Sequence, residues 1–270
     1  MSLSERIAAY DQFILDLDGC VWVGEEGTPG VAEAIDALRA AGKRVAFATN
    51  DPRRADEDYV TKLWSIGVRA SLGDVVTVGG ATQYLLNERH SGSTAFVIGT
   101  ESVRRHVSDA GLHVLNGTDL ASRADVVVVA GTNSLELDDL RLAMLALRRG
   151  GDLVATSRDP VYPTAAGLAP GTGAIVAAVE YCSGATATIV GKPEVGLFET
   201  ALDRLGEGRT LAVGDRLDAD VAAAVAIGLD SALVLTGGTS AEEAAAAIDP
   251  QPTLVADSLA ALVLAESSYS

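Results

Sequence analysis

Two aspartates one residue apart, Asp16 and Asp18, close an apolar stretch that begins at Phe13. The stretch has strand character, and its period-2 spacing places both carboxylates on the same side of an extended backbone. Gly19 follows at once and can take a backbone conformation that turns the chain sharply away. Ligands of open α/β sheets bind beyond the carboxyl ends of the strands, so the pair predicts a site of chemistry. An ordinary solvated Asp-Gly turn is the alternative.

Two later strand-like runs also end in polar residues. Thr49 and Asn50 end one run, and their hydroxyl and amide can donate to an anion; capping of the next helix is the alternative. Lys192 leaves another run beside Pro193, which suits the first turn of a helix, where anions bind favourably. A solvated surface lysine is the alternative there.

A third run, 210–214, is followed by acids. Asp215 ends the run, and Asp218 and Asp220 come soon after it. The helix dipole accounts for acids at the start of a helix, but Asp215 precedes the helix. Four strand ends therefore supply the carboxylates, donors and cation from which one polar site can be built.

Strand-like runs alternate with helical patterns along nearly the whole chain, which predicts a Rossmann-like α/β fold with doubly wound parallel sheets. The expected strands are 12–17, 44–49, 75–78, 94–98, 125–130, 152–156, 187–191, 210–214 and 231–235, and the expected helices are 31–41, 54–66, 101–110, 136–149, 194–205 and 218–227.

Nine strands exceed what one compact sheet needs, and the middle third has an alternation of its own. It ends in the Gly/Pro-rich segment 167–173, which reads as a linker. We therefore expect a core domain built from residues 1–79 and 172–270, with a smaller domain, 80–171, inserted in it.

The composition restricts the classes of partner. A formal charge of −17 and a pI near 4.4 argue against binding to nucleic acid or anionic membrane, and suit a cytosolic protein or one from a salt-rich habitat. No signal peptide and no run long enough to span a membrane is evident, and Cys20 and Cys182 lack metal-ligand spacing. We expect a soluble, cytoplasmic protein without disulfides. Lysine is rare in this sequence. Lys43, Lys62 and Lys192 are its three lysines, against 17 arginines.

The four strand ends resemble the four motifs of the haloacid dehalogenase superfamily, in order. The flanking sequence is similar to that of the NagD-like, p-nitrophenylphosphatase-like branch. In that branch an α/β cap of class II (subclass IIA) is inserted between the second and third motifs. The matching segments are 16–19, 49–50, 192 and 214–220 for the motifs, and 171–175, 190–193 and 234–240 for the branch.

The resemblance implies a phosphatase. Asp16 would attack phosphorus to give an aspartyl-phosphate, and Asp18 would protonate the leaving oxygen and then take a proton from water. Lys192 and Thr49 would hold the phosphoryl oxygens, with Asn50 assisting.

The resemblance also implies a divalent cation. Asp16, the backbone carbonyl of Asp18 and Asp215 would bind it, and ligands that are all oxygen favour Mg²⁺. A cation is needed because several carboxylates would otherwise repel a phosphate dianion. Asp220 would orient the site from behind, and Asp218 would be only a helix-start acid.

Two positions depart from the family pattern. Asp51 adds a carboxylate beside the phosphate site, where it either points away or is offset by Arg53. Cys20 follows the catalytic glycine, and an inert packed thiol is favoured there over a redox switch, because no basic residue adjoins it.

The substrate would be a small phosphomonoester, because a cap that closes over a core excludes bulk water. Sugar phosphates, glycerol phosphate, phosphoglycolate and nucleoside monophosphates all fit. Residues 157–164 are the candidate specificity loop, in which Arg158 would bind a second anion and Tyr162 would line a ring or sugar, with Asp159 between them. For Arg158 and Tyr162, a surface ion pair and packing against nearby prolines are the alternatives.

Three other functions compete with hydrolysis of a phosphate ester. A dehalogenase has no use for Asp18 as an acid for the leaving group. A phosphotransferase would use the same residues but exclude water as the acceptor, and a non-catalytic phosphate sensor would not need both aspartates. Caps of this type often mediate dimers in the family, so a homodimer through the cap is a further expectation.

Overall fold

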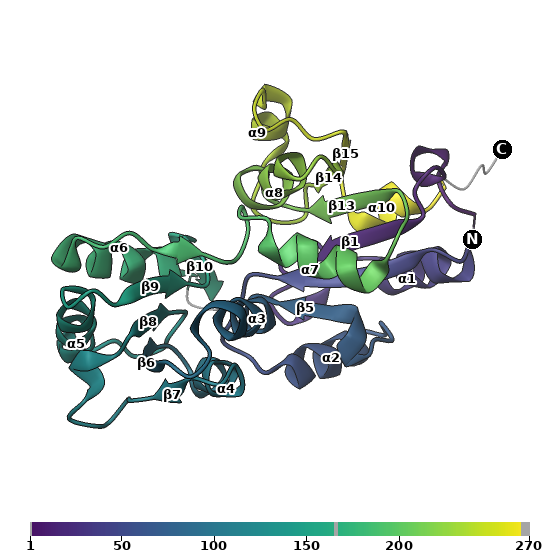
Figure 1. Ribbon diagram of the computed structural model, residues 1–270. Coiled ribbons are helices and arrows are strands. Elements are labelled where there is room, and N and C mark those ends of the chain that lie inside the picture. Colours follow the sequence, from purple (N-terminus) through teal and green to yellow (C-terminus); the bar gives the residue numbers. More distant parts are fainter. Residues whose placement is uncertain (1, 165–166, 266–270) are drawn as a thin grey trace. The chain divides into compact units, whose positions relative to one another are not determined.

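The computed structural model describes residues 2–164 and 167–265 (Figure 1). The chain forms two compact units. The core unit contains Met1–Thr49, Asp56–Val76 and Lys192–Ser270, and the inserted unit contains Asn50–Ala55 and Thr77–Gly191. Among the described residues, no helix combines the length and the apolar character needed to cross a bilayer.

The core unit is built on a six-stranded sheet. Its strand order is β15 (Leu254–Ala256), β14 (Asp230–Val234), β13 (Thr210–Gly214), β1 (Gln12–Asp16), β4 (Arg44–Thr49) and β5 (Val75–Thr77). β1 pairs in parallel with both β13 and β4, so that Leu15 lies opposite Val213 on one side and Phe47 on the other. Every residue of β1 is buried, as expected for a central strand of a parallel sheet.

Helices pack on both faces of this sheet. Phe13 and Leu15 of β1 lie in one apolar cluster with residues of α1 (Val31–Ala40), α2 (Asp56–Ser65) and α10 (Leu259–Val263). α7 (Gly196–Leu205) contacts β1 and β4 and is drawn in front of the sheet in Figure 1. Because successive side chains of a strand point to opposite faces, β1 serves both layers. The core is therefore doubly wound, as predicted.

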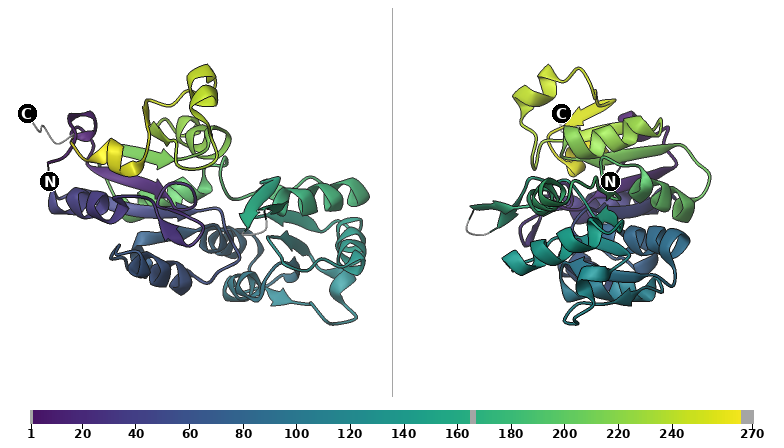
Figure 2. Two further views of the ribbon diagram at one scale, coloured as in Figure 1. Left: turned by 180° about the vertical axis from the view of Figure 1, so that it is seen from behind. Right: turned by 60° about the vertical axis from the view of Figure 1, so that its left-hand side comes forward.

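The first and last described segments of the chain lie side by side in the core unit (Figure 2). Leu3 and Leu264 form an antiparallel bridge, and the amide of Ser4 donates to the carbonyl of Val263 at 2.9 Å. The shorter elements of this unit are η1 (Glu5–Ile7), β2 (Trp22–Val23), β3 (Glu26–Gly27), η2 (Leu72–Asp74), a π-helical turn η4 (Leu217–Val221), α8 (Ala222–Ala226) and α9 (Ala241–Ala246).

The inserted unit has its own five-stranded sheet, in which all neighbouring strands are parallel. The order is β12 (Thr188–Ile189), β9 (Asp152–Ala155), β8 (Val126–Val129), β6 (Thr94–Ile98) and β7 (His113–Val114). Its helices are α3 (Val78–His90), α4 (Glu101–Asp109), η3 (Ala121–Arg123), α5 (Leu137–Leu147) and α6 (Thr172–Ser183). A hairpin of β10 (Val161–Thr164) and β11 (Gly167–Pro170) precedes α6.

The inserted unit extends further along the chain than the expected range 80–171. β12 pairs with β9, and α6 packs against α5, so both belong to the sheet and helices of this unit. The segment 167–173, expected to be a linker, is strand β11 and the start of α6. Composition alone misled here, because two of its glycines serve close packing rather than flexibility.

Gly171 and Gly173 lie directly against the backbone of the loop that precedes β10. Their amides donate to the carbonyls of Pro160 and Asp159 at 2.8 and 2.9 Å. A Cβ on Gly171 would lie 2.2 Å from the Asp159 oxygen, and one on Gly173 would lie 2.2 Å from the Arg158 oxygen. The start of α6 and this loop therefore approach as closely as they do only because both residues lack a side chain.

Gly173→Ala is expected to destabilise the protein by about 1 to 3 kcal/mol, because the new methyl group overlaps a backbone oxygen that cannot rotate away. Alanine is favoured in a helix by about 1 kcal/mol, and the clash outweighs that gain. Denaturant unfolding followed by circular dichroism measures the change. Gly73→Ala is the control, because the nearest atom to its new Cβ is the Ser71 hydroxyl at 3.6 Å. Equal stability of the two variants would contradict the packing argument.

Candidate active site

The candidate site lies at the carboxyl edge of the core sheet. β1 ends at Asp16, β4 ends at Thr49, and Asp215 directly follows β13. Because β13, β1 and β4 are parallel neighbours, their ends come together at this edge. Asp16, Thr49 and Asp215 are all buried.

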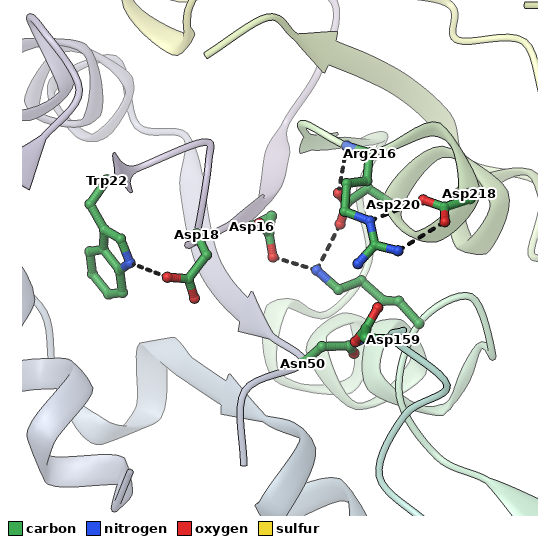
Figure 3. Close-up of polar contacts among 9 residues, drawn as sticks. Asp16, Asp18, Trp22, Asn50, Asp159, Arg216, Asp218 and Asp220 are labelled. Carbon is green, nitrogen blue, oxygen red and sulfur yellow. Dashed lines mark hydrogen bonds and ion pairs between the residues drawn. The ribbon is translucent and has the colours of Figure 1, made fainter. Parts of the chain in front are cut away.

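Lys192 joins this edge from a different part of the chain. Its ammonium donates to the Asp16 carboxylate and, at 2.7 Å, to Oδ1 of Asp220 (Figure 3). The lysine side chain is only 3 % exposed, so the surface-lysine alternative is excluded. α7 begins at Gly196, so Lys192 and Pro193 lie in the turn before the helix rather than in its first turn.

The local electrostatics keep Lys192 charged. Burial by itself would lower the pKa of the ammonium, but the carboxylates of Asp16 and Asp220 outweigh it and raise that pKa above its usual value. Burial raises the pKa of Asp16 well above its usual range, Lys192 opposes the rise, and Asp220 and Asp215 add to it. Several buried carboxylates face a single ammonium, so the site carries excess negative charge.

Asp215 lies in a space lined by glycine backbone. A Cβ on Gly19 would lie 2.3 Å, and one on Gly237 2.1 Å, from Oδ2 of Asp215, and the Gly238 amide donates to the same oxygen. Gly19 has φ +87°, which glycine adopts without strain. Burial raises the pKa of Asp215 to about 6, Asp220 adds to the rise, and the Gly238 amide opposes it.

The residues present fit a divalent cation. Carboxylate oxygens of Asp16, Asp215 and Asp220 lie within 4.8 Å of one another, and all three residues are buried. Hard oxygen donors with excess negative charge suit Mg²⁺. The expected set was Asp16, the Asp18 carbonyl and Asp215. The carboxylates that the structure brings together include Asp220, which also holds Lys192.

Asp18 differs from Asp16 in its surroundings. Its side chain is exposed, and Oδ1 accepts a hydrogen bond of 2.9 Å from the indole nitrogen of Trp22. The backbone between them is a closed turn, in which the Gly19 amide donates to the Trp22 carbonyl at 2.7 Å. The two aspartates are therefore held in different ways, one by a buried cation and the other by an indole.

The acidic segment after Asp215 divides into two kinds of residue. Asp220 is buried and accepts from both Lys192 and the Arg216 amide, the latter at 3.1 Å. Asp218 is exposed and pairs with the Arg216 guanidinium at 2.9 and 3.0 Å. That pairing lowers the pKa of Asp218 and keeps its charge away from the buried carboxylates.

The residues after Thr49 belong to the inserted unit. The Asn50 amide donates to Oδ2 of Asp159 at 3.3 Å, which joins two of the residues singled out from the sequence (Figure 3). Asp51 accepts from Nε of Arg53 at 2.6 Å, so the extra carboxylate is offset by the neighbouring arginine.

The loop residues have partners within the inserted unit. Both terminal nitrogens of Arg158 donate to the Glu180 carboxylate, at 2.9 and 2.6 Å, so Arg158 forms an ion pair, as in the alternative to binding a second anion. The Arg53 guanidinium lies 3.9 Å from the centre of the Tyr162 ring. The candidate loop 157–164 is described except for the side chains of residues 163 and 164.

Sequence reasoning missed several contributors to the site. Thr236 donates to the carbonyl of Gly19, and the Thr239 amide donates to the carbonyl of Asp215 at 3.1 Å, so the loop after β14 binds the loops after β1 and β13 together. The Thr-Gly-Gly-Thr segment resembled the family pattern, but the sequence did not indicate which groups its residues contact. Trp22 had no signal beyond its position near Asp18.

Cys20 is completely buried, and burial first, then Asp16, raise the pKa of its thiol well above its usual value. A thiol held protonated is a poor nucleophile, which supports the inert role. Both cysteines of the chain are free.

At this edge the buried carboxylate of Asp16 lies directly beside the ammonium of Lys192. The fold is a Rossmann-like α/β fold, and this carboxylate–ammonium pair lies at the carboxyl edge of its parallel sheet. The chain belongs to the haloacid dehalogenase-like hydrolase family. A family model with that description matches residues 13–113, and a second, HAD-hydrolase-like, matches residues 189–262.

Several of its relatives are phosphatases. The chain is 35 % identical to the D-glycerol 3-phosphate phosphatase of Mycobacterium tuberculosis, over 94 % of this chain and 71 % of the relative. It is 31 % identical to the 5'-nucleotidase YutF of Bacillus subtilis, over 93 % and 96 %. The solved structure of the M. tuberculosis glycerol phosphate phosphatase in complex with magnesium superposes with a TM-score of 0.88 at 34 % identity, covering 97 % of this chain and 78 % of that one.

The raised pKa of Asp215 predicts how stability depends on pH in the metal-free protein. A carboxyl with a pKa of about 6 when folded and 3.8 when unfolded binds its proton more tightly in the folded state. Its contribution is fully present below pH 4 and is lost as the pH rises through 6. Replacement by Asn is therefore expected to raise the free energy of unfolding at pH 7 by about 1 to 3 kcal/mol relative to wild type, and to have little effect at pH 4.

Tryptophan fluorescence during urea unfolding, in the presence of EDTA, measures this difference, because both Trp22 and Trp64 lie in the core unit. Asp218→Asn is the matched control with the opposite sign, since Arg216 lowers the pKa of Asp218 and the ionised form stabilises the fold. A difference between wild type and Asp215→Asn that stayed constant from pH 4 to 7 would contradict the assignment.

Proposed function

We propose that this chain is a Mg²⁺-dependent phosphatase that hydrolyses small phosphomonoesters through an aspartyl-phosphate on Asp16. The observation that carries the proposal is the buried Lys192 ammonium, which pairs with Asp16 and Asp220 at the carboxyl edge of the core sheet. A lysine in that position neutralises an incoming phosphoryl group and is itself held by Asp220 when the phosphate binds.

The reaction divides between the two aspartates. A carboxylate oxygen of Asp16 attacks phosphorus, and the bond from phosphorus to the leaving oxygen breaks. Asp18 gives its proton to that oxygen, and then takes a proton from the water that attacks the aspartyl-phosphate. Lys192 and Thr49 hold the phosphoryl oxygens, and Asn50 assists from the next position in the chain.

Asp16, the carbonyl of Asp18 and Asp215 would hold Mg²⁺, which supplies positive charge between the carboxylates and the phosphate dianion. Asp220 positions Lys192, and its hydrogen bond from the Arg216 amide fixes its own direction. Asp218 lies outside this machinery, because its charge is taken up by Arg216.

The substrate class is a phosphorylated metabolite of modest size. Phosphatases of glycerol phosphate and of nucleotides among the relatives support this class, which also includes sugar phosphates and phosphoglycolate. In the inserted unit, which we propose acts as a cap, Asp159 and Tyr162 are candidate specificity residues. Arg158 is proposed to act mainly by fixing the loop, because Glu180 already takes both of its terminal nitrogens.

The proposal extends to a cytoplasmic enzyme that forms a homodimer through the inserted unit. Free cysteines and an acidic composition support the location. The inserted unit exposes large apolar side chains that such a contact could cover, among them Tyr84, Leu137, Leu168 and Tyr181. Sedimentation of the purified chain measures the assembly.

Asp16→Asn is expected to lower kcat for p-nitrophenyl phosphate by about 10⁴-fold or more while the fold survives, because an amide cannot form the phosphoenzyme. Asp218→Asn makes the same chemical change outside the site and is expected to retain activity. Phosphate release and transfer to an added alcohol are measured in parallel. Transfer exceeding release would favour a phosphotransferase, and a fully active Asp16→Asn would overturn the nucleophile assignment.

Mg²⁺ is expected to raise the melting temperature of the wild type, because an ion that binds only the folded state stabilises it by about 2.7 kcal/mol at a hundredfold excess over Kd. Asp215→Asn is expected to lose most of that increase, and EDTA is expected to abolish turnover. Differential scanning calorimetry with and without MgCl₂ gives the shift. An equal shift in wild type and Asp215→Asn would place the ion elsewhere.

A further inference from the structure

Trp22 is buried at a functional position that the family resemblance does not explain. Its indole nitrogen donates to Oδ1 of Asp18 at 2.9 Å, while the indole itself is only 1 % exposed. Asp18 is exposed, and an exposed carboxylate samples several rotamers unless a fixed group holds it. A buried donor directed at an exposed carboxylate limits where that carboxylate can point (Figure 3).

The backbone reinforces this contact. The amide of Trp22 donates to the carbonyl of Leu17 at 3.1 Å, and the Gly19 amide donates back to the Trp22 carbonyl at 2.7 Å. The turn from Leu17 to Trp22 is thereby closed by hydrogen bonds in both directions. The indole and the carboxylate therefore keep a constant separation, which a donor on a distant loop would not ensure.

Lys62 packs over the face of the indole ring. Its ammonium lies 4.3 Å from the centre of the Trp22 ring and donates to the Gly24 carbonyl at 2.6 Å. Its side chain is 8 % exposed, and it is one of only three lysines in the chain. A buried cation over an indole is a favourable contact, and the hydrogen bond to Gly24 ties α2 to the turn after Trp22.

The other tryptophan provides a comparison within the same unit. Trp64 is 60 % exposed and donates its indole N–H to the carbonyl of Ala70 at 2.7 Å, away from both aspartates. Filling the core would require only an aromatic ring at position 22. The indole N–H of Trp22 is not needed for that packing, and it donates to the Asp18 carboxylate.

We propose that Trp22 is a positioning residue for Asp18, whose carboxyl it aims at the leaving oxygen, and that Lys62 holds the indole in place. The inference rests on the proposed phosphatase function. It assigns the indole N–H an effect on departure of the leaving group, and none on the attack by Asp16.

The contact itself is tested in the metal-free protein by NMR. A ¹⁵N-labelled chain gives two indole N–H peaks, one for each tryptophan, and Trp22→Phe removes and so identifies one of them. Asp18→Ala is expected to shift the Trp22 peak upfield and leave the Trp64 peak in place. An unmoved Trp22 peak would overturn the proposal whatever the enzyme's activity.

The catalytic effect is tested with two leaving groups. Departure of an alkyl alcohol depends on the proton from Asp18, whereas p-nitrophenolate leaves with little help. Trp22→Phe is expected to lower kcat/KM for glycerol phosphate about tenfold more than kcat/KM for p-nitrophenyl phosphate. Trp64→Phe is the matched control, with neither value changed. Equal losses for both substrates would mean that Trp22 only stabilises the fold.

Lys62→Met keeps the indole and removes the cation. It is expected to lower kcat/KM for glycerol phosphate more than kcat/KM for p-nitrophenyl phosphate, by a smaller factor than Trp22→Phe does. If Trp22→Phe does not fold, Lys62→Met provides the test in its place. An equal loss of kcat/KM for the two esters, or no loss for either, would overturn the proposal. A wild type without Mg²⁺-dependent turnover of either ester would instead refute the proposed function, and the NMR result would stand apart from it.

Discussion

The ammonium of Lys192 lies buried between the carboxylates of Asp16 and Asp220, and the rest of the site is arranged around this contact. A buried charge without partners costs several kcal/mol, so neither the lysine nor its acids could occupy this position alone. The contact joins segments 176 and 28 residues apart in sequence. It requires β1, the turn before α7 and the turn after β13 to meet at one point.

The parallel sheet provides that meeting point. Strands that run in the same direction end at the same edge, so polar residues placed after β1, β4 and β13 come together without any contact between them having to form first. Glycines then allow close approach. Gly19 and Gly237 leave the space that the Asp215 carboxylate fills, and an alanine at either position would overlap it.

The site retains an unfavourable electrostatic feature that the fold tolerates. Three buried carboxylates share one ammonium, and burial raises the pKa of both Asp16 and Asp215. Such a cluster is a poor contribution to stability and a good receptor for a divalent cation. Asp218 does not add to this excess of negative charge, because its side chain is exposed and pairs with Arg216. The same like charges that repel one another here would attract a ligand of opposite charge.

Local sequence was sufficient to predict the polar residues and the edge at which they lie, because strand character, its abrupt end and the turn that follows are encoded over fewer than ten residues. That is why Asp16, Lys192 and Asp215 could be predicted. The extent of the inserted unit could not, since β12 belongs there only through its pairing with β9. The same holds for the glycines at 171 and 173, which resembled a linker until their contacts with the preceding loop were seen. Which group touches which was decided by tertiary structure alone: Asp220 on Lys192, Trp22 on Asp18, Glu180 on Arg158. The amino-acid sequence determined which chemical groups the site contains. Packing between distant segments determined which of these groups contact one another, because a hydrogen bond depends on distance and direction in space.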